Sequence, residues 1–191
     1  LDKTKSLDDV AKFLGSKAFV VMPKMDGLTC SLRYVNGQLI SAETRGDGEI
    51  GESVLHCAKV IKNLPLQIQY TGDLIVDGEV IIADADFQDI NASLPDGEKY
   101  KNSRNLVSGS IRQLDSKIAA QRNMRFIAWK CVSPLTLTKH DSNNSFSWRL
   151  HELSEMGFET VYHFEGRINA LLNFPQYYHN NITDSSIILN D

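Results

Sequence analysis

Apolar and polar residues alternate through much of the first half of the chain, in runs of strand length. The runs 28–34 and 38–43 flank Asn36-Gly37, a dipeptide that favours the tight turn of a β-hairpin. A short apolar run at 18–22 precedes them, and a β-branched run at 74–82 follows. The pattern therefore predicts short strands, two of which are joined as a hairpin.

Helical patterns occur between these strands. Ser6, followed by two aspartates, is typical of an N-cap, and the helix it opens should stop at Gly15. Strands and helices then mix without a regular βαβ rhythm, which favours the α+β class over a doubly wound sheet. Further helices are expected at 51–62, 84–91, 104–114, 148–156 and from about 168, further strands at 124–132 and 159–164, and loops at 44–48, 94–103 and 133–147.

Composition narrows the class of protein. The chain has 191 residues, 42% of them hydrophobic and 23% charged, enough to bury a core as one domain. It contains no apolar run of membrane-spanning length and no signal-like start, so we expect no membrane association and a cytoplasmic location. Three singly placed cysteines indicate neither a zinc site nor a disulfide framework.

Charge leaves two interpretations open. A net charge of −4 argues against a dedicated nucleic-acid-binding module. The window 99–125 is nevertheless basic, and it represents either solvated helix faces or a phosphate-binding surface. Its charged residues are Lys99, Lys101, Arg104, Arg112, Lys117, Arg122 and Arg125, against Asp115 alone.

Charged residues interrupt the apolar pattern at three places close to glycines. A buried carboxylate is costly unless it is paired, so each place asks for an explanation. A surface ion pair or an edge strand with one wet face would explain any single place. Three of them together favour a site, formed by Lys24 and Asp26, Arg45 and Asp47, and Asp77 and Glu79.

These residues carry a resemblance to a known family. Lys24-Met25-Asp26-Gly27 matches the KxDG motif of the covalent nucleotidyltransferases, and residues 44–48 with Gly51-Glu52 resemble the TRGDG…GE segment of NAD-dependent DNA ligases. The segments 77–79, 103–115 and 126–129 resemble three further motifs of that family, in the same order. The chain is thus similar to a DNA ligase adenylation domain, which implies a nucleotidyltransferase (ATP-grasp-like ligase) fold with antiparallel sheets flanked by helices.

The resemblance implies a reaction. Lys24 would attack the α-phosphate of NAD, expel nicotinamide mononucleotide and form lysyl-AMP. AMP would then pass to the 5′-phosphate of a nick in double-stranded DNA, and the 3′-hydroxyl would seal it. Asp26 would help hold the site, and Glu79 would accept a hydrogen bond from the ribose hydroxyl. Mg²⁺ would offset the phosphate charge, with ligands that the motifs do not identify.

The resemblance also implies binding residues. Met22 and Pro23 would border the adenine, Trp129 would stack on it, and Arg45 would contact ribose or phosphate. Arg104 and Arg112, eight residues apart on one expected helix, would contact phosphates of the nicked strand. Met22 departs from the family, which usually has a glutamate there that reads the adenine amino group, and Asp77 and the pair 107–108 differ as well.

The resemblance covers one domain, 1–191, which we expect to end at or before the family's fourth motif. No NMN-binding, OB, zinc-finger, helix-hairpin-helix or BRCT domain is expected in this chain. Either the 191 residues are a fragment or a second polypeptide supplies the remaining motifs. Two alternatives stay open, an ATP-using DNA or RNA ligase and a catalytically incomplete subunit, and the source would be a bacterium or a phage or other virus in its host.

Overall fold

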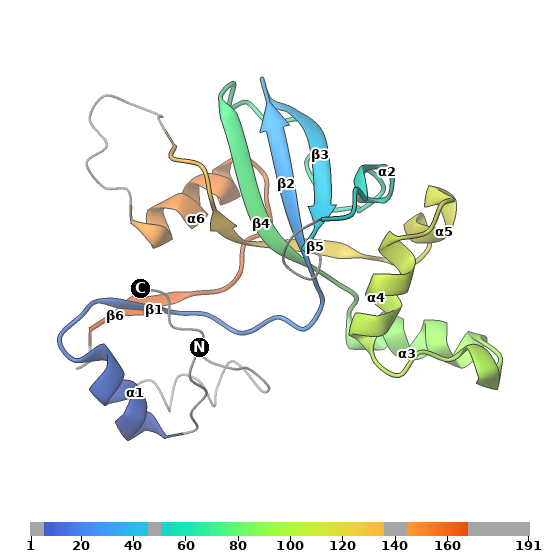
Figure 1. Ribbon diagram of the computed structural model, residues 1–191, viewed down its shortest axis with the longest axis horizontal. Coiled ribbons are helices and arrows are strands. Elements are labelled where there is room, and N and C mark those ends of the chain that lie inside the picture. Colours follow the sequence, from blue (N-terminus) through green and yellow to red (C-terminus); the bar gives the residue numbers. More distant parts are fainter. Residues whose placement is uncertain (1–5, 46–50, 136–144, 168–191) are drawn as a thin grey trace. The chain divides into compact units, whose positions relative to one another are not determined.

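The computed structural model describes residues 6–45, 51–135 and 145–167, and the chain forms two compact units. The smaller unit is made of residues 1–24 and 162–191, and the larger unit of residues 25–161. Figure 1 draws both with their elements labelled. None of the helices in the described part of the chain has the length and hydrophobicity that a bilayer span requires.

The smaller unit begins with the predicted helix. The Ser6 hydroxyl accepts a hydrogen bond from the Asp9 N–H at 3.3 Å, as expected of an N-cap, and Gly15 ends the helix with φ +53°. The described part of the unit also has two short antiparallel strands, with the rings of Phe19 and Phe164 at 6.5 Å. Its elements are α1 (Leu7–Leu14), β1 (Phe19–Val21) and β6 (Phe164–Gly166).

The larger unit is built on a four-stranded antiparallel sheet with the strand order β3-β2-β4-β5. Asn36 and Gly37, with φ of +49° and +77°, form the tight turn between β2 and β3, so the predicted hairpin is confirmed. The mixed architecture also confirms the α+β class. The strands are β2 (Leu28–Val35), β3 (Gln38–Thr44), β4 (Asp73–Ile81) and β5 (Arg125–Cys131).

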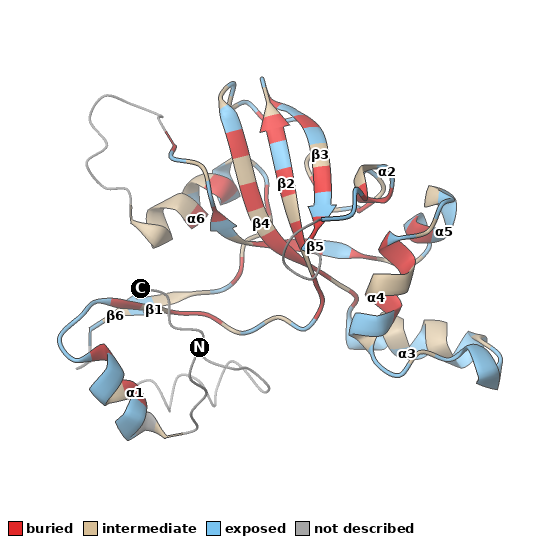
Figure 2. Cartoon of the chain, in the orientation of Figure 1, coloured by how far each residue is buried: buried red, intermediate tan, exposed pale blue. Residues whose placement is uncertain are grey.

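The two faces of this sheet differ in polarity, and the alternation of burial is visible along the strands in Figure 2. One face forms the core, where Tyr34 packs its ring edge-on against Phe158 at 5.5 Å. Its buried side chains include Leu28, Leu32, Tyr34, Leu74, Val76, Val80 and Phe126. The strand register places polar residues on the opposite face, among them Thr29, Ser31, Asp77, Glu79 and Lys130.

The helices of the larger unit depart from the prediction in two ways. A helix over 51–62 is wrong, because Ser53 pairs with Glu43 of β3 and only α2 is helical there. The helix over 104–114 is cut short, because α4 ends at Ile111 and a separate α5 begins after Asp115. The helices are α2 (Leu55–Ala58), α3 (Asp84–Ser93), a 3₁₀ turn η1 (Asp96–Glu98), α4 (Ser103–Ile111), α5 (Ser116–Ala120) and α6 (Phe146–Glu155).

The strand predicted at 159–164 is also wrong, because its residues divide between the two units. Thr160 makes a single parallel bridge to Ala128 of β5, and β6 begins only at Phe164. The glycine-rich loop lies largely outside the described residues, as do most of the predicted loop at 133–147 and the helix expected from 168.

Candidate nucleotide-binding face

The predicted site residues belong to both units. Met22, Pro23 and Lys24 belong to the smaller unit, where Met22 is 3% exposed and Lys24 is exposed. The other described candidates belong to the larger unit: Asp26, Arg45, Glu79, Arg104, Arg112 and Trp129. Asp47 lies outside the described residues.

Glu79 is the buried carboxylate of the polar face. It lies opposite Thr29 in the β2–β4 ladder, is 8% exposed, and its Oε2 accepts a hydrogen bond from the Thr29 hydroxyl at 3.1 Å. A buried carboxylate needs such a donor because desolvation disfavours its charged form. The pairing of β2 with β4 therefore fixes the Glu79 carboxylate beside the Thr29 hydroxyl.

Gly27 explains why the lysine motif ends in glycine. A Cβ at this position would overlap the carbonyl oxygen of Val80 and lie 2.9 Å from Cγ2 of Ile81. Only glycine therefore lets the chain run this close to β4 as it enters β2. Because Glu79 precedes Val80, this close approach brings the end of the lysine motif next to Glu79.

Arg45 continues the hairpin beyond the end of β3. Its N–H donates to the Thr29 carbonyl at 3.1 Å, while its side chain is exposed. Thr29 thus links the start of the glycine-rich loop, through its carbonyl, to Glu79, through its hydroxyl. Three segments that are distant in sequence meet at this one threonine.

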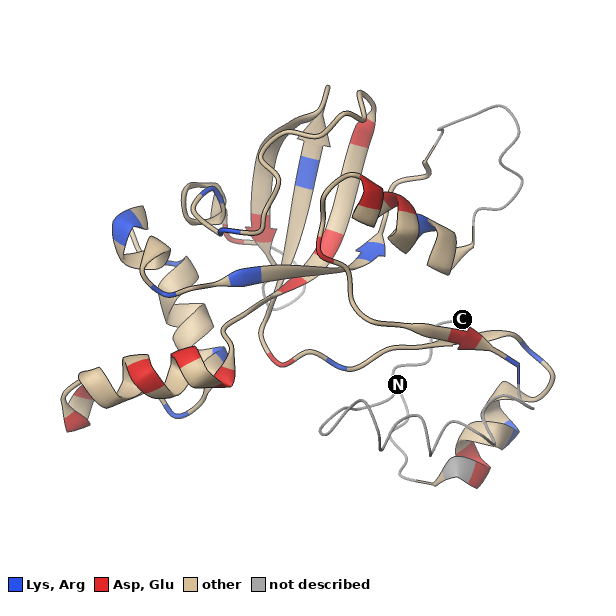
Figure 3. Ribbon diagram, turned by 180° about the vertical axis from the view of Figure 1, so that it is seen from behind, with Lys and Arg blue, Asp and Glu red and all other residues tan. Residues whose placement is uncertain are grey.

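Both candidate phosphate-binding arginines are ion-paired with acids from other motifs. Arg104 Nη1 lies 3.7 Å from Asp26 Oδ1, with side chains that are 52% and 67% exposed. Arg112 Nε donates to Glu52 Oε2 at 2.6 Å. The predicted helix would have carried both arginines, but Arg112 is the residue that caps the end of α4. Figure 3 shows the charged residues along these elements.

Glu52 is a residue for which the sequence motifs suggested no role. Its backbone is held by Thr44, whose N–H donates to Glu52 O at 2.9 Å and whose hydroxyl accepts from the Glu52 N–H at 3.4 Å. The backbone of Glu52 is therefore fixed, and its carboxylate holds the Arg112 side chain in place. Arg112 Nη1 also donates to the Ser108 carbonyl at 3.4 Å. Gly51-Glu52, the pair that follows the TRGDG segment, is the sequence feature that could have pointed to a role for Glu52.

Trp129 is the extra residue of a β-bulge. Ala128 pairs with Gly78 and Lys130 with Asp77, so Trp129 has no partner of its own in β4. Ala128 faces the core, and the next residue, Trp129, is directed to the polar face. Without the extra residue Lys130 would take a core position, so the bulge keeps Trp129 and Lys130 out of the core together.

Gly78 makes room on the core side of the same strand pair. A Cβ there would overlap Cζ of Phe126 and lie 2.5 Å from its Cε2 and 2.7 Å from the Ile127 carbonyl oxygen. The glycine between Asp77 and Glu79 is therefore required by packing, while its two acidic neighbours face the polar side.

Comparison with known proteins decides the family. The model of the NAD-dependent DNA ligase adenylation domain matches residues 4–184. The chain belongs to this family.

Curated relatives extend the same finding. The DNA ligase of Lachnoclostridium phytofermentans is 48% identical over 165 residues, which cover 84% of this chain and 24% of that ligase. The DNA ligase of Malacoplasma penetrans is 50% identical over 149 residues, which cover 77% of this chain and 21% of that ligase. The adenylation domain described here thus spans about a quarter of the length of these relatives.

Solved structures are less similar. A structure from a study of Lig E DNA ligases aligns with a TM-score of 0.45 and 20% identity, over 90% of this chain and 54% of that one.

The thiols of this adenylation domain are buried. Burial raises the pKa of Cys30 to about 12, and the carboxylates of Asp77, Glu43 and Glu79 act in the same direction. Burial likewise raises the pKa of Cys131 to about 11. Both thiols therefore stay protonated near neutral pH. Among the described residues, no group of three or more His, Cys, Asp or Glu side chains is arranged to hold a metal ion.

Proposed function

We propose that this chain catalyses the adenylation step of an NAD-dependent DNA ligase, with Lys24 as the nucleophile. The observation that supports it best is that two motif residues, Arg45 and Glu79, meet at Thr29, two residues after the lysine motif. The Thr29 carbonyl accepts from the Arg45 N–H, and its hydroxyl donates to Glu79. A carboxylate and an arginine held on either side of β2 suit a nucleoside ribose and its phosphate.

The step transfers an adenylyl group to the lysine amine. A neutral Lys24 Nζ attacks the α-phosphorus of NAD, a nitrogen–phosphorus bond forms, and the bond to the nicotinamide mononucleotide oxygen breaks. One amine proton is released to solvent in this step, and nicotinamide mononucleotide departs as the leaving group. Positioning and charge neutralisation dominate phosphoryl transfer, so the protein's main task is to hold the nucleotide.

The surrounding residues have separate tasks in this proposal. Glu79 accepts a hydrogen bond from a ribose hydroxyl, and Asp26 with Arg104 holds the strand terminus that attacks later. The Trp129 ring stacks on adenine, and Met22 and Pro23 border it. Because Met22 has no carboxylate, base recognition depends on stacking and backbone groups more than on a side-chain acceptor.

A divalent cation is part of the proposal. Mg²⁺ is usually bound through one or two carboxylates together with substrate phosphates and water. The described residues fit this mode, since the exposed Asp26, and Glu79 on the polar face of the sheet, are single carboxylates that belong to no group of three potential ligands. Bound Mg²⁺ would supply charge neutralisation on the phosphate.

Nicked double-stranded DNA is the proposed partner. Arg104 and Arg112 are exposed and carry the fork geometry that suits phosphate oxygens. Because the chain spans about a quarter of its relatives, sealing of the nick by a longer ligase or with a second polypeptide is included in the proposal. The bacterial relatives support a bacterial cytoplasmic protein.

The test is covalent labelling with NAD that carries a label in its adenylate. Peptide mass mapping should find AMP on Lys24, and Lys24→Met should abolish it. Lys17→Met, which removes another exposed lysine of the smaller unit, should keep the label. An unmodified Lys24, with and without a candidate C-terminal polypeptide, would refute the proposal. Label transferred from ATP and not from NAD would instead favour an ATP-using ligase.

A further inference from the structure

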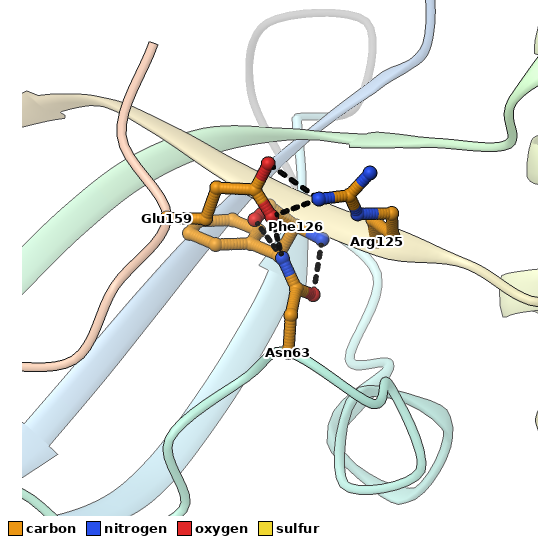
Figure 4. Close-up of polar contacts among 4 residues, drawn as sticks. All are labelled: Asn63, Arg125, Phe126 and Glu159. Carbon is orange, nitrogen blue, oxygen red and sulfur yellow. Dashed lines mark hydrogen bonds and ion pairs between the residues drawn. The ribbon is translucent and has the colours of Figure 1, made fainter.

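The outer edge of β5 is closed by a side chain. β5 is the last strand of the sheet, so the backbone groups on its outer edge need partners from elsewhere. Asn63 supplies both for Phe126: its Nδ2 donates to Phe126 O at 2.8 Å, and its Oδ1 accepts from Phe126 N at 2.9 Å. One side-chain amide here replaces a peptide group of a neighbouring strand, as Figure 4 shows.

Glu159 closes the next outward-facing position. Its carbonyl accepts from Ala128 N, and Val161 N donates to Ala128 O, both at 2.8 Å. Its carboxylate accepts twice from Arg125 Nη2, at 2.6 and 2.7 Å, and once from Asn63 Nδ2 at 2.8 Å. Asn63, Arg125 and Glu159 thus form one connected cluster, called the β5 clamp below (Figure 4).

The clamp ends at the residue before the bulge. Phe126 and Ala128 are bonded on the outer edge, and their neighbours pair with β4, so the strand is held on both sides up to Ala128. Trp129 comes next and has no partner in the ladder. A bulge is the place where a strand can change register, and a one-residue slip here would turn Lys130 toward the core.

We propose that the β5 clamp positions Trp129 for stacking on the nucleotide base, with Asn63 as the positioning residue. The identity of the stacked base rests on the function proposed above, whereas the link between Asn63 and Trp129 does not. The ion pair within the clamp has side chains 51% and 37% exposed, and such pairs add little to stability. The clamp therefore acts mainly by fixing the geometry of β5 and contributes little to the free energy of unfolding.

The experiment uses Trp129 as its own reporter. The chain has two tryptophans, so Trp148→Phe leaves Trp129 as the single one. In this background Asn63→Ala should about double the rate constant for acrylamide quenching of Trp129 without nucleotide, because the bulge loses its support. It should also weaken AMP binding about tenfold, toward the lower end of what stacking on an aromatic contributes.

A matched control is available in α3. Asn91 makes the same two bonds to a backbone residue, since its Nδ2 donates to Tyr100 O at 3.0 Å and its Oδ1 accepts from Tyr100 N at 2.8 Å. Asn91→Ala should therefore cost similar stability and leave both Trp129 quenching and AMP affinity unchanged. In a Trp129→Ala background, Asn63→Ala should no longer change AMP affinity, because the residue it acts through is gone.

Equal behaviour of the two asparagine variants in the quenching measurement would overturn the proposal. If the parent chain binds no AMP, the proposed function loses support, while the nucleotide-free quenching still decides the role of Asn63. Should Asn63→Ala fail to fold, Asn63→Asp keeps the acceptor for Phe126 N but loses the donor to Phe126 O and to Glu159. It should then raise quenching of Trp129 above that of the parent, and an unchanged value would refute the link.

Discussion

Gly78→Ala tests the packing that separates the core from the candidate site. The added Cβ would overlap Cζ of Phe126 and lie 2.7 Å from the carbonyl oxygen of Ile127. The ring can shift, but the backbone oxygen belongs to the ladder between β4 and β5 and cannot turn away. The methyl group therefore forces the two strands apart next to Asp77 and Glu79.

The expected magnitude follows from two opposing terms. Overpacking a filled core costs about 1–3 kcal/mol, and a backbone obstacle places this site toward the upper end. Replacing glycine by alanine lowers the entropy of the unfolded chain and returns about 0.4–1 kcal/mol. The free energy of unfolding should thus fall by roughly 2 kcal/mol, which lowers Tm by about 4–8 °C in a chain of this length.

Urea denaturation followed by circular dichroism measures the effect. Gly97→Ala is the control, because a Cβ there has no heavy atom within 4 Å, and it should be neutral or slightly stabilising. In a Phe126→Leu background the cost of Gly78→Ala should shrink, because the ring that it meets is gone. If Gly78→Ala were as stable as Gly97→Ala, the packing of Phe126 over Gly78 would be wrong.

Three further substitutions or treatments follow from single contacts. Glu52→Gln should release Arg112 and change the free energy of unfolding by less than about 1 kcal/mol. It should also steepen the slope of log DNA affinity against log salt concentration by up to about 0.9. An unchanged slope would show that Arg112 is not a phosphate contact. Cys30, with its pKa raised by burial from 9.0 to about 12, should resist iodoacetamide at pH 8 until the chain is denatured, and stability should fall as the pH rises above 9, since only the unfolded thiol then loses its proton. Tyr34→Phe removes a 2.6 Å bond to the Pro65 carbonyl and should cost about 1 kcal/mol in urea titrations.

Local signals predicted the elements whose backbone they determine by themselves. Asn36-Gly37 adopts the positive φ values that a two-residue hairpin turn requires, and Ser6 caps α1 with its own hydroxyl. In both cases one or two residues set the geometry, so no distant partner was needed. Gly157, with φ +94°, ends α6 in the same way.

Segments that depend on distant partners were predicted less well. The run 51–62 has helical periodicity, yet Ser53 pairs with Glu43, and the chain becomes helical only at α2. Tertiary pairing here overrides a weak local preference. The separate α5 was missed as well, although Asp115, whose carboxylate accepts from the Lys117 N–H, is an N-cap signal in the sequence.

The candidate site shows the same division. Motif order predicts candidate residues such as Arg104 and Arg112, because each motif is a local string. It could not identify their partners, since Arg112 meets Glu52 across 60 positions. Which charges neutralise each other depends on strand register and on where a helix ends, and neither can be read from the motif itself.

The bulge at Trp129 is the feature that sequence reasoning could least provide. In a regular strand, Phe-Ile-Ala-Trp-Lys-Cys would turn Phe, Ala and Lys to one face and leave Lys130 in the core. One extra residue opposite Asp77 returns Cys131 to the core and Lys130 to the polar face. Pattern alone cannot place that residue, because the bonds of Asn63 and Glu159, from segments far from β5 in sequence, fix the strand up to Ala128. A tryptophan motif therefore predicts the stacking residue, but its orientation depends on an asparagine 66 residues earlier in the chain.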